Sequence, residues 1–129
     1  MESEKYNRRS IGQEGEEFAC RMLEERGHII LERNWRSGHL EIDIISHDAV
    51  GIHFVEVKTR QHSIQAPPQD NVDKAKQRRT ASAAKAYLKS RPGLPFRNHE
   101  CIFDVVAITF RGERAEAEYI EQAFIPLYI

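Results

Sequence analysis

Two neighbouring segments of the chain alternate between apolar and polar positions with the two-residue period of a β-strand. The first is Leu-Glu-Ile-Asp-Ile-Ile, residues 40–45, and the second is His-Phe-Val-Glu-Val-Lys-Thr-Arg, residues 53–60. Asp48 and Gly51, which favour turns, stand between them. This pattern predicts a β-hairpin.

A two-residue turn at Ala49-Val50 would fix the pairing of this hairpin. It places Asp43 opposite Glu56 and Glu41 opposite Lys58, with paired Cβ atoms about 5 Å apart. Two carboxylates held that close repel each other unless a cation lies between them, and a hard ion such as Mg²⁺ prefers oxygen ligands. Lys58, on the same face as Glu56, could hold or deprotonate a water molecule beside the metal.

The alternative is that these charges form the solvated face of an ordinary antiparallel hairpin. Three apolar residues, Ile45, Ile52 and Phe54, share that face near the turn. A face that is both apolar and charged is not expected to be open to water. This weakens the solvated-face interpretation but leaves it open.

The N-terminal part of the chain predicts a helix from Ser10 to Arg26, closed by Gly27 and preceded by a flexible arm, residues 1–9. Its apolar stripe consists of Ile11, Gly15, Phe18, Ala19 and Met22. Glu16 lies on the flank of this stripe, whereas Glu17 faces solvent. Glu16 is therefore the better placed acid for a site at the edge of the core, and an ordinary solvated glutamate is the alternative.

The rest of the pattern predicts strands at residues 28–34, 101–110 and 117–123, a loop at 61–71, a helix at 71–90 and an apolar tail at 124–129. The order α-β-β-β-α-β-β indicates an α/β fold, a mixed sheet with helices on its faces. Residues 10–129 would form one domain.

Three features of these elements have expected positions. Trp35 to Gly38 should turn the chain into the hairpin, with Trp35 capping the core rather than forming a stacking platform. The strand at 101–110 should be buried on both faces. Asp104 interrupts it, so this carboxylate needs a partner such as arginine or lysine and is interpreted as structural support.

Composition excludes some classes of protein. The chain has 129 residues, a net charge of −1 and two cysteines, Cys20 and Cys101, without C-x-x-C spacing. Neither a zinc finger nor a disulfide framework is indicated, which favours the cytoplasm. No apolar run approaches the roughly 18 residues of a membrane span, and no signal-peptide pattern is present.

Charge is distributed unevenly along the chain. Between Lys74 and His99 there are eight lysines and arginines and no acid. A helix that contacts phosphates would have this composition, although a solvated helix is the alternative. The neutral total charge argues mildly against a dedicated nucleic-acid binder.

Several motifs, in matching order over about residues 12–125, resemble those of the YraN-like family of uncharacterised bacterial proteins. That family is assigned to the PD-(D/E)XK nuclease superfamily and is similar in its core to Holliday-junction resolvases. The matching motifs are Gly12-x-x-Gly15-Glu16-x-x-Ala19, Leu31-x-Arg33-Asn34-x-Arg36, Glu41-Ile42-Asp43, Phe54-Val55-Glu56-Val57-Lys58-Thr59-Arg60, Lys76 with Arg79, and Phe103-Asp104-Val105-Val106. The chain departs from the family at Leu40, where glycine is usual.

The resemblance implies a restriction-endonuclease-like three-layer core and a Mg²⁺- or Mn²⁺-dependent endonuclease acting on DNA, in particular branched or structured DNA. The superfamily motif maps onto Asp43, Glu56 and Lys58 as catalytic residues, with Glu16 as the helix acid. Asp43, Glu56 and the backbone carbonyl of Val57 would hold the metal. The expected nucleic-acid contacts are Lys76, Arg79, Arg60 and Arg36, and the expected supporting residues are Glu41 and Asp104. A homodimer follows by analogy with resolvases.

Two other classes of protein remain open. A nucleic-acid-binding or adaptor protein could keep this fold without turnover, with Glu56 and Lys58 forming a simple ion pair. A structural protein could associate through its apolar tail.

Overall fold

The computed structural model describes residues 2–61 and 74–125 of the chain. Within these residues the helices and strands follow the predicted order α-β-β-β-α-β-β, with one short 3-10 helix added. The elements are α1 (Glu2–Glu25), β1 (Ile29–Ser37), β2 (Leu40–His47), β3 (Ile52–Gln61), α2 (Lys74–Lys89), η2 (Leu94–Phe96), β4 (Cys101–Arg111) and β5 (Arg114–Phe124).

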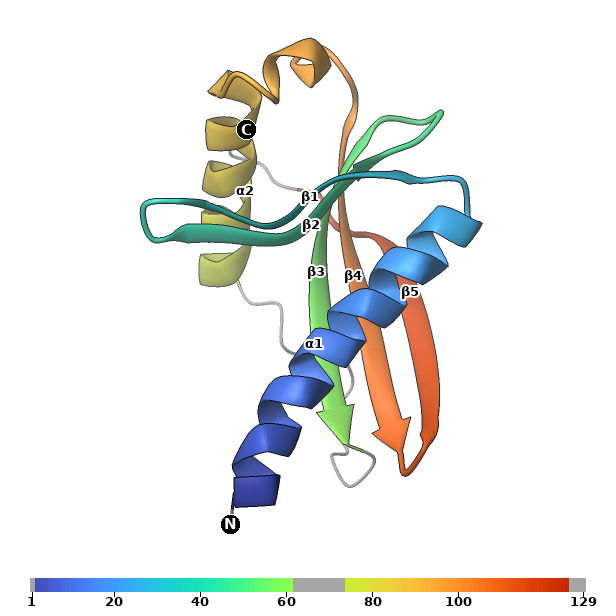
Figure 1. Ribbon diagram of the computed structural model, residues 1–129. Coiled ribbons are helices and arrows are strands. Elements are labelled where there is room, and N and C mark those ends of the chain that lie inside the picture. Colours follow the sequence, from blue (N-terminus) through green and yellow to red (C-terminus); the bar gives the residue numbers. More distant parts are fainter. Residues whose placement is uncertain (1, 62–73, 126–129) are drawn as a thin grey trace.

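The strands form one sheet in the order β1-β2-β3-β4-β5. Strands β3 and β4 are parallel, and the other neighbouring pairs are antiparallel. The sheet is therefore mixed, as predicted, with β3 at its centre. Figure 1 shows α1 crossing the front of the sheet and α2 on the other side, next to the β1–β2 hairpin.

Two hydrophobic clusters, one for each helix, make this arrangement a three-layer core. On one face of the sheet Ala19 and Leu23 of α1 pack with Ile44, Val55 and Val106. On the other face the α2 residues Ala83, Ala84 and Tyr87 pack with a second set of strand residues, Ile42, Ile45, Ile52, Phe54 and Phe103. Each helix buries one apolar side against the sheet, and burial of apolar area is the main favourable term in folding.

Helix α1 is longer than predicted. It begins at Glu2, so Ser10 lies inside the helix and not at its start. Residues 2–9, for which a flexible arm was predicted, form the first part of this helix. Glutamate and lysine are good helix formers, and acids are favourable near a helix N-terminus, so Met-Glu-Ser-Glu-Lys could have indicated this start. The predicted end is confirmed: Gly27 has a φ of 93°, the left-handed conformation that closes many helices.

The turn between β1 and β2 lies later in the chain than predicted. Trp35 and Arg36 belong to β1, and the chain turns at Gly38, whose φ is 61°. Trp35 is partly buried against the core, with its ring centroid 5.2 Å from that of Tyr87. The prediction that Trp35 caps the core is confirmed.

Helix α2 ends at Lys89, shortly before Pro92-Gly93, as expected. Asn71 and Asp73, the two residues proposed for its first turn, lie outside the described residues, as does most of the predicted loop at 61–71.

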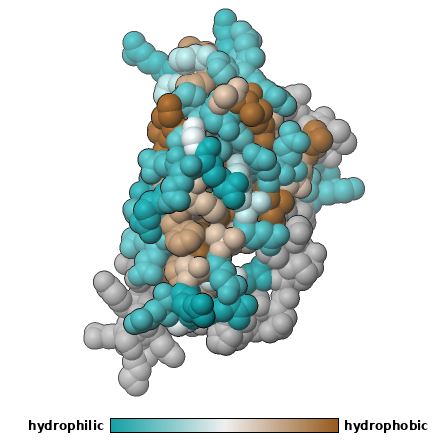
Figure 2. Space-filling view, turned by 90° about the vertical axis from the view of Figure 1, so that its right-hand side faces the viewer, coloured by the Kyte–Doolittle hydropathy of each residue, from teal (hydrophilic) through white to brown (hydrophobic). Residues whose placement is uncertain are grey.

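The C-terminal half of the sheet agrees with the prediction. All residues from Ile102 to Ile108 are buried, so β4 is covered on both faces. Strand β5, by contrast, is an edge strand with many exposed residues. Figure 2, which views the molecule from the right-hand side of Figure 1, shows mainly hydrophilic residues with hydrophobic groups between them. In the described part of the chain, neither helix has the length and apolar character needed to cross a membrane. Residues 126–129 of the predicted tail lie outside it.

Candidate active site

The predicted hairpin register is confirmed at the turn end of β2 and β3. The pairs run from His47 with Ile52 to Ile44 with Val55, as a two-residue turn at Ala49-Val50 requires. The ladder ends there, one pair before Asp43 would meet Glu56. Figure 1 shows the outer part of the β1–β2 hairpin turned away from β3.

Strand β2 changes direction at Asp43. Ile42 packs in the cluster under α2 and Ile44 in the cluster under α1, so the two residues face opposite helices although they are two positions apart. At the bend the Asp43 side chain points to β3, where its Oδ2 accepts a hydrogen bond of 2.9 Å from the backbone N–H of Val57. A side chain thus replaces the next backbone pair of the ladder.

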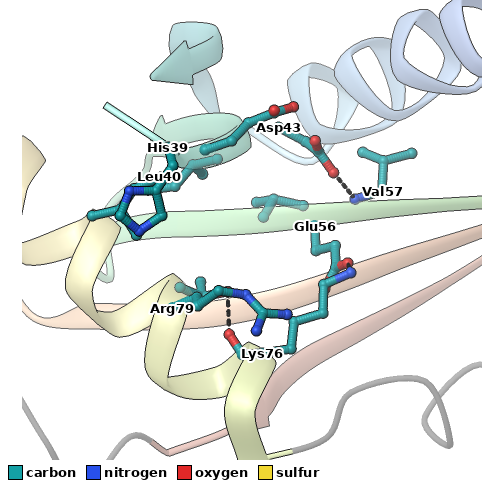
Figure 3. A pocket seen from close by; sticks show the side chains of 11 residues that line it. His39, Leu40, Asp43, Glu56, Val57, Lys76 and Arg79 are labelled. Carbon is teal, nitrogen blue, oxygen red and sulfur yellow. Dashed lines mark hydrogen bonds and ion pairs between the residues drawn. The ribbon is translucent and has the colours of Figure 1, made fainter. Parts of the chain in front are cut away.

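The separation of the strands opens a pocket of about 350 Å³. Figure 3 shows Asp43 on one side of it, Lys76 and Arg79 of α2 on the opposite side, and Glu56 between them. The residues lining the pocket are His39, Leu40, Glu41, Ile42, Asp43, Val55, Glu56, Val57, Lys76, Arg79 and Thr80. Two predicted metal ligands and two predicted phosphate contacts therefore share one cavity with the backbone of Val57.

Asp43 lies in an environment that disfavours its charge. Burial raises its pKa to about 6, and the negative charges of Glu16, Glu56 and Glu41 act in the same direction. The hydrogen bond from Val57 opposes them. Desolvation together with neighbouring carboxylates is a combination found at functional sites.

Glu56 is held by two lysines. Its Oε1 lies 3.4 Å from Lys58 Nζ and forms a closer ion pair with Lys76 Nζ. Burial lowers the pKa of Lys58, and the charge of Lys76 adds to this effect. For Lys76 burial also acts to lower the pKa, but the hydrogen bond and charge of Glu56 outweigh it and raise the value. The two amines beside one carboxylate are thus electrostatically different.

Glu16 lies beside this pocket and does not line it. Its Oε1 accepts a hydrogen bond of 3.1 Å from Asn34 Nδ2, and both residues line a neighbouring hollow. Asn34 has a φ of 52°, a left-handed conformation that is uncommon for residues other than glycine. The charge of Glu16 still acts on Asp43. As the helical-face argument predicted, Glu17 is the more exposed of the two acids.

Close packing of α1 on β3 holds Glu16 at this place. The neighbouring residue, Gly15, is buried, and a Cβ atom there would lie 2.3 Å from Oγ1 of Thr59. Only a glycine lets the helix approach the strand so closely without a shift. Since Thr59 follows Lys58 directly, this contact brings α1 to the part of β3 that carries the lysine.

Two of the predicted basic contacts lie away from the pocket lining. Arg36 forms an exposed ion pair of 3.2 Å with Glu41, and the two residues are also backbone partners in the β1–β2 ladder. The predicted pairing of Glu41 with Lys58 is therefore wrong, because β2 has left β3 by this point. Arg60 lies on β3 two residues beyond Lys58, next to Thr109 of β4.

Asp104 is buried as expected, but the predicted kind of partner is wrong. Its Oδ2 lies 2.6 Å from His53 Nδ1 and accepts a hydrogen bond of 2.5 Å from the Tyr119 hydroxyl, while Oδ1 accepts one of 3.0 Å from the Gln122 N–H. A histidine, a tyrosine and a backbone amide thus satisfy a carboxylate for which arginine or lysine was expected.

A polar cluster that the sequence interpretation missed lies around this carboxylate. It contains His28, Asp48 and His53, whose potential ligand atoms all lie within 4.8 Å of one another. The group could hold a metal ion. Its members come from three segments, and their spacing matches no sequence motif. A possible signal was the presence of His28 and His53 at the start of two apolar strands.

Comparison with known proteins covers both the pocket and most of the chain. The model of a family described as uncharacterised protein family UPF0102 matches residues 15–108, which include every residue lining the pocket. The chain belongs to this family.

Individual UPF0102 relatives match over almost their whole length. The chain is 38% identical to a UPF0102 protein of Bacteroides thetaiotaomicron over 117 residues, which cover 90% of this chain and 93% of the relative. It is 42% identical to one of Geobacter metallireducens over 117 residues with the same coverage, and 39% identical to one of Myxococcus xanthus over 119 residues, 91% of this chain and 90% of the relative. These names specify no activity, so the argument for function depends on the pocket.

Proposed function

We propose that this UPF0102 protein is a metal-dependent nuclease of the PD-(D/E)XK superfamily that hydrolyses phosphodiester bonds in DNA. The observation that carries the proposal is the pocket where β2 leaves β3. Its lining brings together two carboxylates and the basic side of α2 from three separate elements, and Lys58, which is not part of the lining, contacts Glu56. An ordinary solvated hairpin face would not gather these groups around a cavity.

The residues fit a hard divalent cation. Mg²⁺ and Mn²⁺ bind oxygen, and the pocket offers the carboxylates of Asp43 and Glu56. The N–H of Val57 points to Asp43, and in a strand the carbonyl of the same residue points to the same side. Burial, and after it the charges of neighbouring carboxylates, raises the pKa of Asp43, and a bound cation would offset both effects. The ammonium group of Lys76 lies against Glu56 and is a cation that a metal ion would replace there.

Each side chain has a role in hydrolysis. When bound, the metal ion would lower the pKa of a water molecule and stabilise the charge that develops on the phosphate. Lys58, whose pKa is lowered by burial, is suited to orient this water or accept its proton. Glu16 would position the water shell from the side of α1. Lys76 would move from Glu56 to the phosphate, and Arg79 would hold the neighbouring backbone.

Branched or otherwise structured DNA, cut by a homodimer, is the form of this proposal that the resemblance to resolvases favours. The experiment is cleavage of end-labelled four-way junction, flap and linear DNA with Mg²⁺, with Mn²⁺ and with chelator. Asp43→Asn, purified identically, is the control, because the amide oxygen can still accept the Val57 hydrogen bond. We expect cutting that requires metal and falls by at least roughly 10²-fold in the variant. Equal cutting by both proteins would contradict the proposal.

A second function, DNA binding without turnover, is favoured by one observation. Glu56 is already paired with Lys58 and Lys76, so its charge is balanced and the three side chains could have a structural role only. This function predicts no heat of Mg²⁺ or Mn²⁺ binding by calorimetry. It also predicts salt-dependent DNA affinity that Asp43→Asn leaves unreduced.

A further inference from the structure

The second polar cluster lies where three segments meet, at the end of the molecule that carries the β2–β3 turn (Figure 1). His28 follows the end of α1, Asp48 opens the turn, and His53 is the second residue of β3. The two Nε2 atoms point to one carboxylate: His53 Nε2 is 2.9 Å from Asp48 Oδ1, and His28 Nε2 is 3.5 Å from Asp48 Oδ2.

Both imidazole rings are oriented through their other nitrogen. Nδ1 of His28 lies 2.8 Å from Ser46 Oγ, and Nδ1 of His53 lies 2.6 Å from Asp104 Oδ2. Histidines that bind metals almost always have one nitrogen hydrogen-bonded in this way, which fixes the ring and leaves the other nitrogen for the ion. Both partners are already in place here.

The carboxylate is held as firmly as the rings. Asp48 Oδ1 accepts hydrogen bonds from the N–H groups of Val50 and Gly51, at 3.0 and 3.2 Å. These bonds belong to the turn itself, so the position of Asp48 follows from the hairpin geometry. The side chain of Asp48 is 16% exposed, while those of His28 and His53 are 2% and 1% exposed. An ion could therefore enter from the side of Asp48.

A cavity of about 310 Å³ adjoins His53 on this side and is also lined by Val50, Ile102, Glu121 and Gln122. It provides room for a water molecule or another ligand beside His53. Glu121 lies close enough for its charge to act on His28.

We propose that His28, Asp48 and His53 bind one Zn²⁺ ion, with a fourth position open to the cavity. Zn²⁺ favours four ligands with nitrogen and oxygen atoms about 2.0 Å away, which places neighbouring ligand atoms of a tetrahedron roughly 3.3 Å apart. Asp48 Oδ1 lies 2.9 Å from His53 Nε2, Asp48 Oδ2 lies 3.5 Å from His28 Nε2, and one candidate atom from each of the three residues lies within 4.8 Å of the others. Binding through one oxygen of Asp48 would therefore draw the three side chains together.

The ion would join the end of α1, the hairpin turn and β3 at one point. The same nitrogen and oxygen atoms also lie within hydrogen-bond distance of one another in the pair His53 Nε2 and Asp48 Oδ1. The site is independent of the proposed nuclease activity, because none of its three ligands lines the Asp43 pocket.

The first test is a zinc titration of the full chain, stripped with chelator, against a chromophoric zinc indicator. The same titration is made on Asp43→Asn with Glu56→Gln, so that zinc bound in the pocket is not counted. We expect one zinc per chain in both proteins, and a rise in the thermal unfolding midpoint with zinc concentration. Folded protein that binds no zinc, or loses it when the pocket is changed, would overturn the proposal.

Three single variants then locate the ion. His28→Gln should abolish tight binding, whereas Ser46→Ala, which removes only the partner of a ligand, should weaken it roughly 10–100-fold. His47→Gln is the matched control, since His47 is on the same hairpin but packs against Phe96, and it should bind like the wild type. Equal affinity in Ser46→Ala and wild type would overturn the assignment even if His28→Gln fails to fold.

Discussion

The β2–β3 hairpin carries two polar clusters that differ in how their charges are balanced. At the turn, His53 lies between Asp48 and Asp104, and each contact is made by a buried ring with little freedom to move. Where the strands separate, Asp43 accepts a hydrogen bond from the Val57 N–H while the charges of three neighbouring glutamates disfavour its ionised form. Glu56 there is paired with flexible lysine side chains. The turn cluster is rigid, whereas the pocket can exchange its cations.

The ligand atoms make the two clusters suited to different partners. Imidazole nitrogens with one carboxylate suit zinc, whereas carboxylate and carbonyl oxygens suit Mg²⁺ or Mn²⁺. One hairpin can therefore carry two chemically different sites when one of its strands bends between them, as β2 does at Asp43. Strand pairing continues through the turn cluster and stops at Ile44 and Val55, where the pocket begins.

The largest expected effect is on DNA cleavage, which should depend on the Asp43 pocket and not on the polar cluster at the turn. Lys58→Ala should lower metal-dependent cleavage by roughly 10²–10⁴-fold, the usual contribution of a general acid or base. Zinc binding at the turn should not change, because Lys58 lies five residues further along β3 than His53. The measurement is single-turnover cleavage of the preferred DNA substrate together with the zinc titration.

Lys89→Ala is the matched control, since Lys89 is an exposed lysine in the last turn of α2. It should cut like the wild type. If Lys58→Ala also cuts at the wild-type rate, the pocket has no catalytic lysine and the contrast between the clusters is broken.

The second prediction concerns the sign of a stability change. The pKa of Asp43 is raised from its usual 3.8 to about 6, so the folded chain holds this proton more tightly than the unfolded chain. Ionised Asp43 therefore destabilises the fold increasingly as pH rises from about 4 to about 6, and by a constant amount above that range. Asp43→Asn removes this charge and should raise the free energy of unfolding by about 1–3 kcal/mol at pH 7.5.

Asp104→Asn should change stability in the opposite direction. Its carboxylate accepts from the Tyr119 hydroxyl and the Gln122 N–H and contacts His53, so an amide would leave one contact unmatched, at a cost of about 1–3 kcal/mol. Urea unfolding of both variants and wild type at pH 5 and pH 7.5 provides the comparison. A gain for Asp43→Asn that is as large at pH 5 as at pH 7.5 would contradict the electrostatic explanation, because Asp43 is largely protonated in the folded chain at pH 5.

Much of the fold follows from local sequence signals. The two-residue alternation and the turn residues Asp48 and Gly51 predicted the hairpin register, and the uninterrupted apolar run predicted the buried strand β4. Helical spacing placed Glu16 nearer the core than Glu17. These signals act over a few residues, so one sequence is sufficient to interpret them.

The parts that could not be predicted depend on how strands bend and meet. The alternation of apolar and polar residues does not show that Ile42 and Ile44 face opposite helices. The predicted pairing of β2 with β3 therefore continued past the bend, as far as Glu41 and Lys58. The partners of Asp104 come from β3 and β5, whose positions in the sheet are set by the whole fold. For the same reason the sequence does not show that His28 and His53, which stand at the start of two apolar strands, meet in one cluster.

The smallest expected effect tests whether the basic side of the pocket contacts phosphates. Arg79 lines the pocket beside Lys76 on α2, opposite Asp43 (Figure 3). If it contacts one phosphate, Arg79→Ala should reduce the slope of log affinity against log salt by about 0.9 for duplex DNA and weaken binding similarly for all sequences. Lys85→Ala, on an exposed position of the same helix, is the control. Fluorescence anisotropy over a range of salt concentrations measures both slopes. An unchanged slope for Arg79→Ala would mean that Arg79 contacts no phosphate. The proposal that the Asp43 pocket binds DNA would then lose one of its supports.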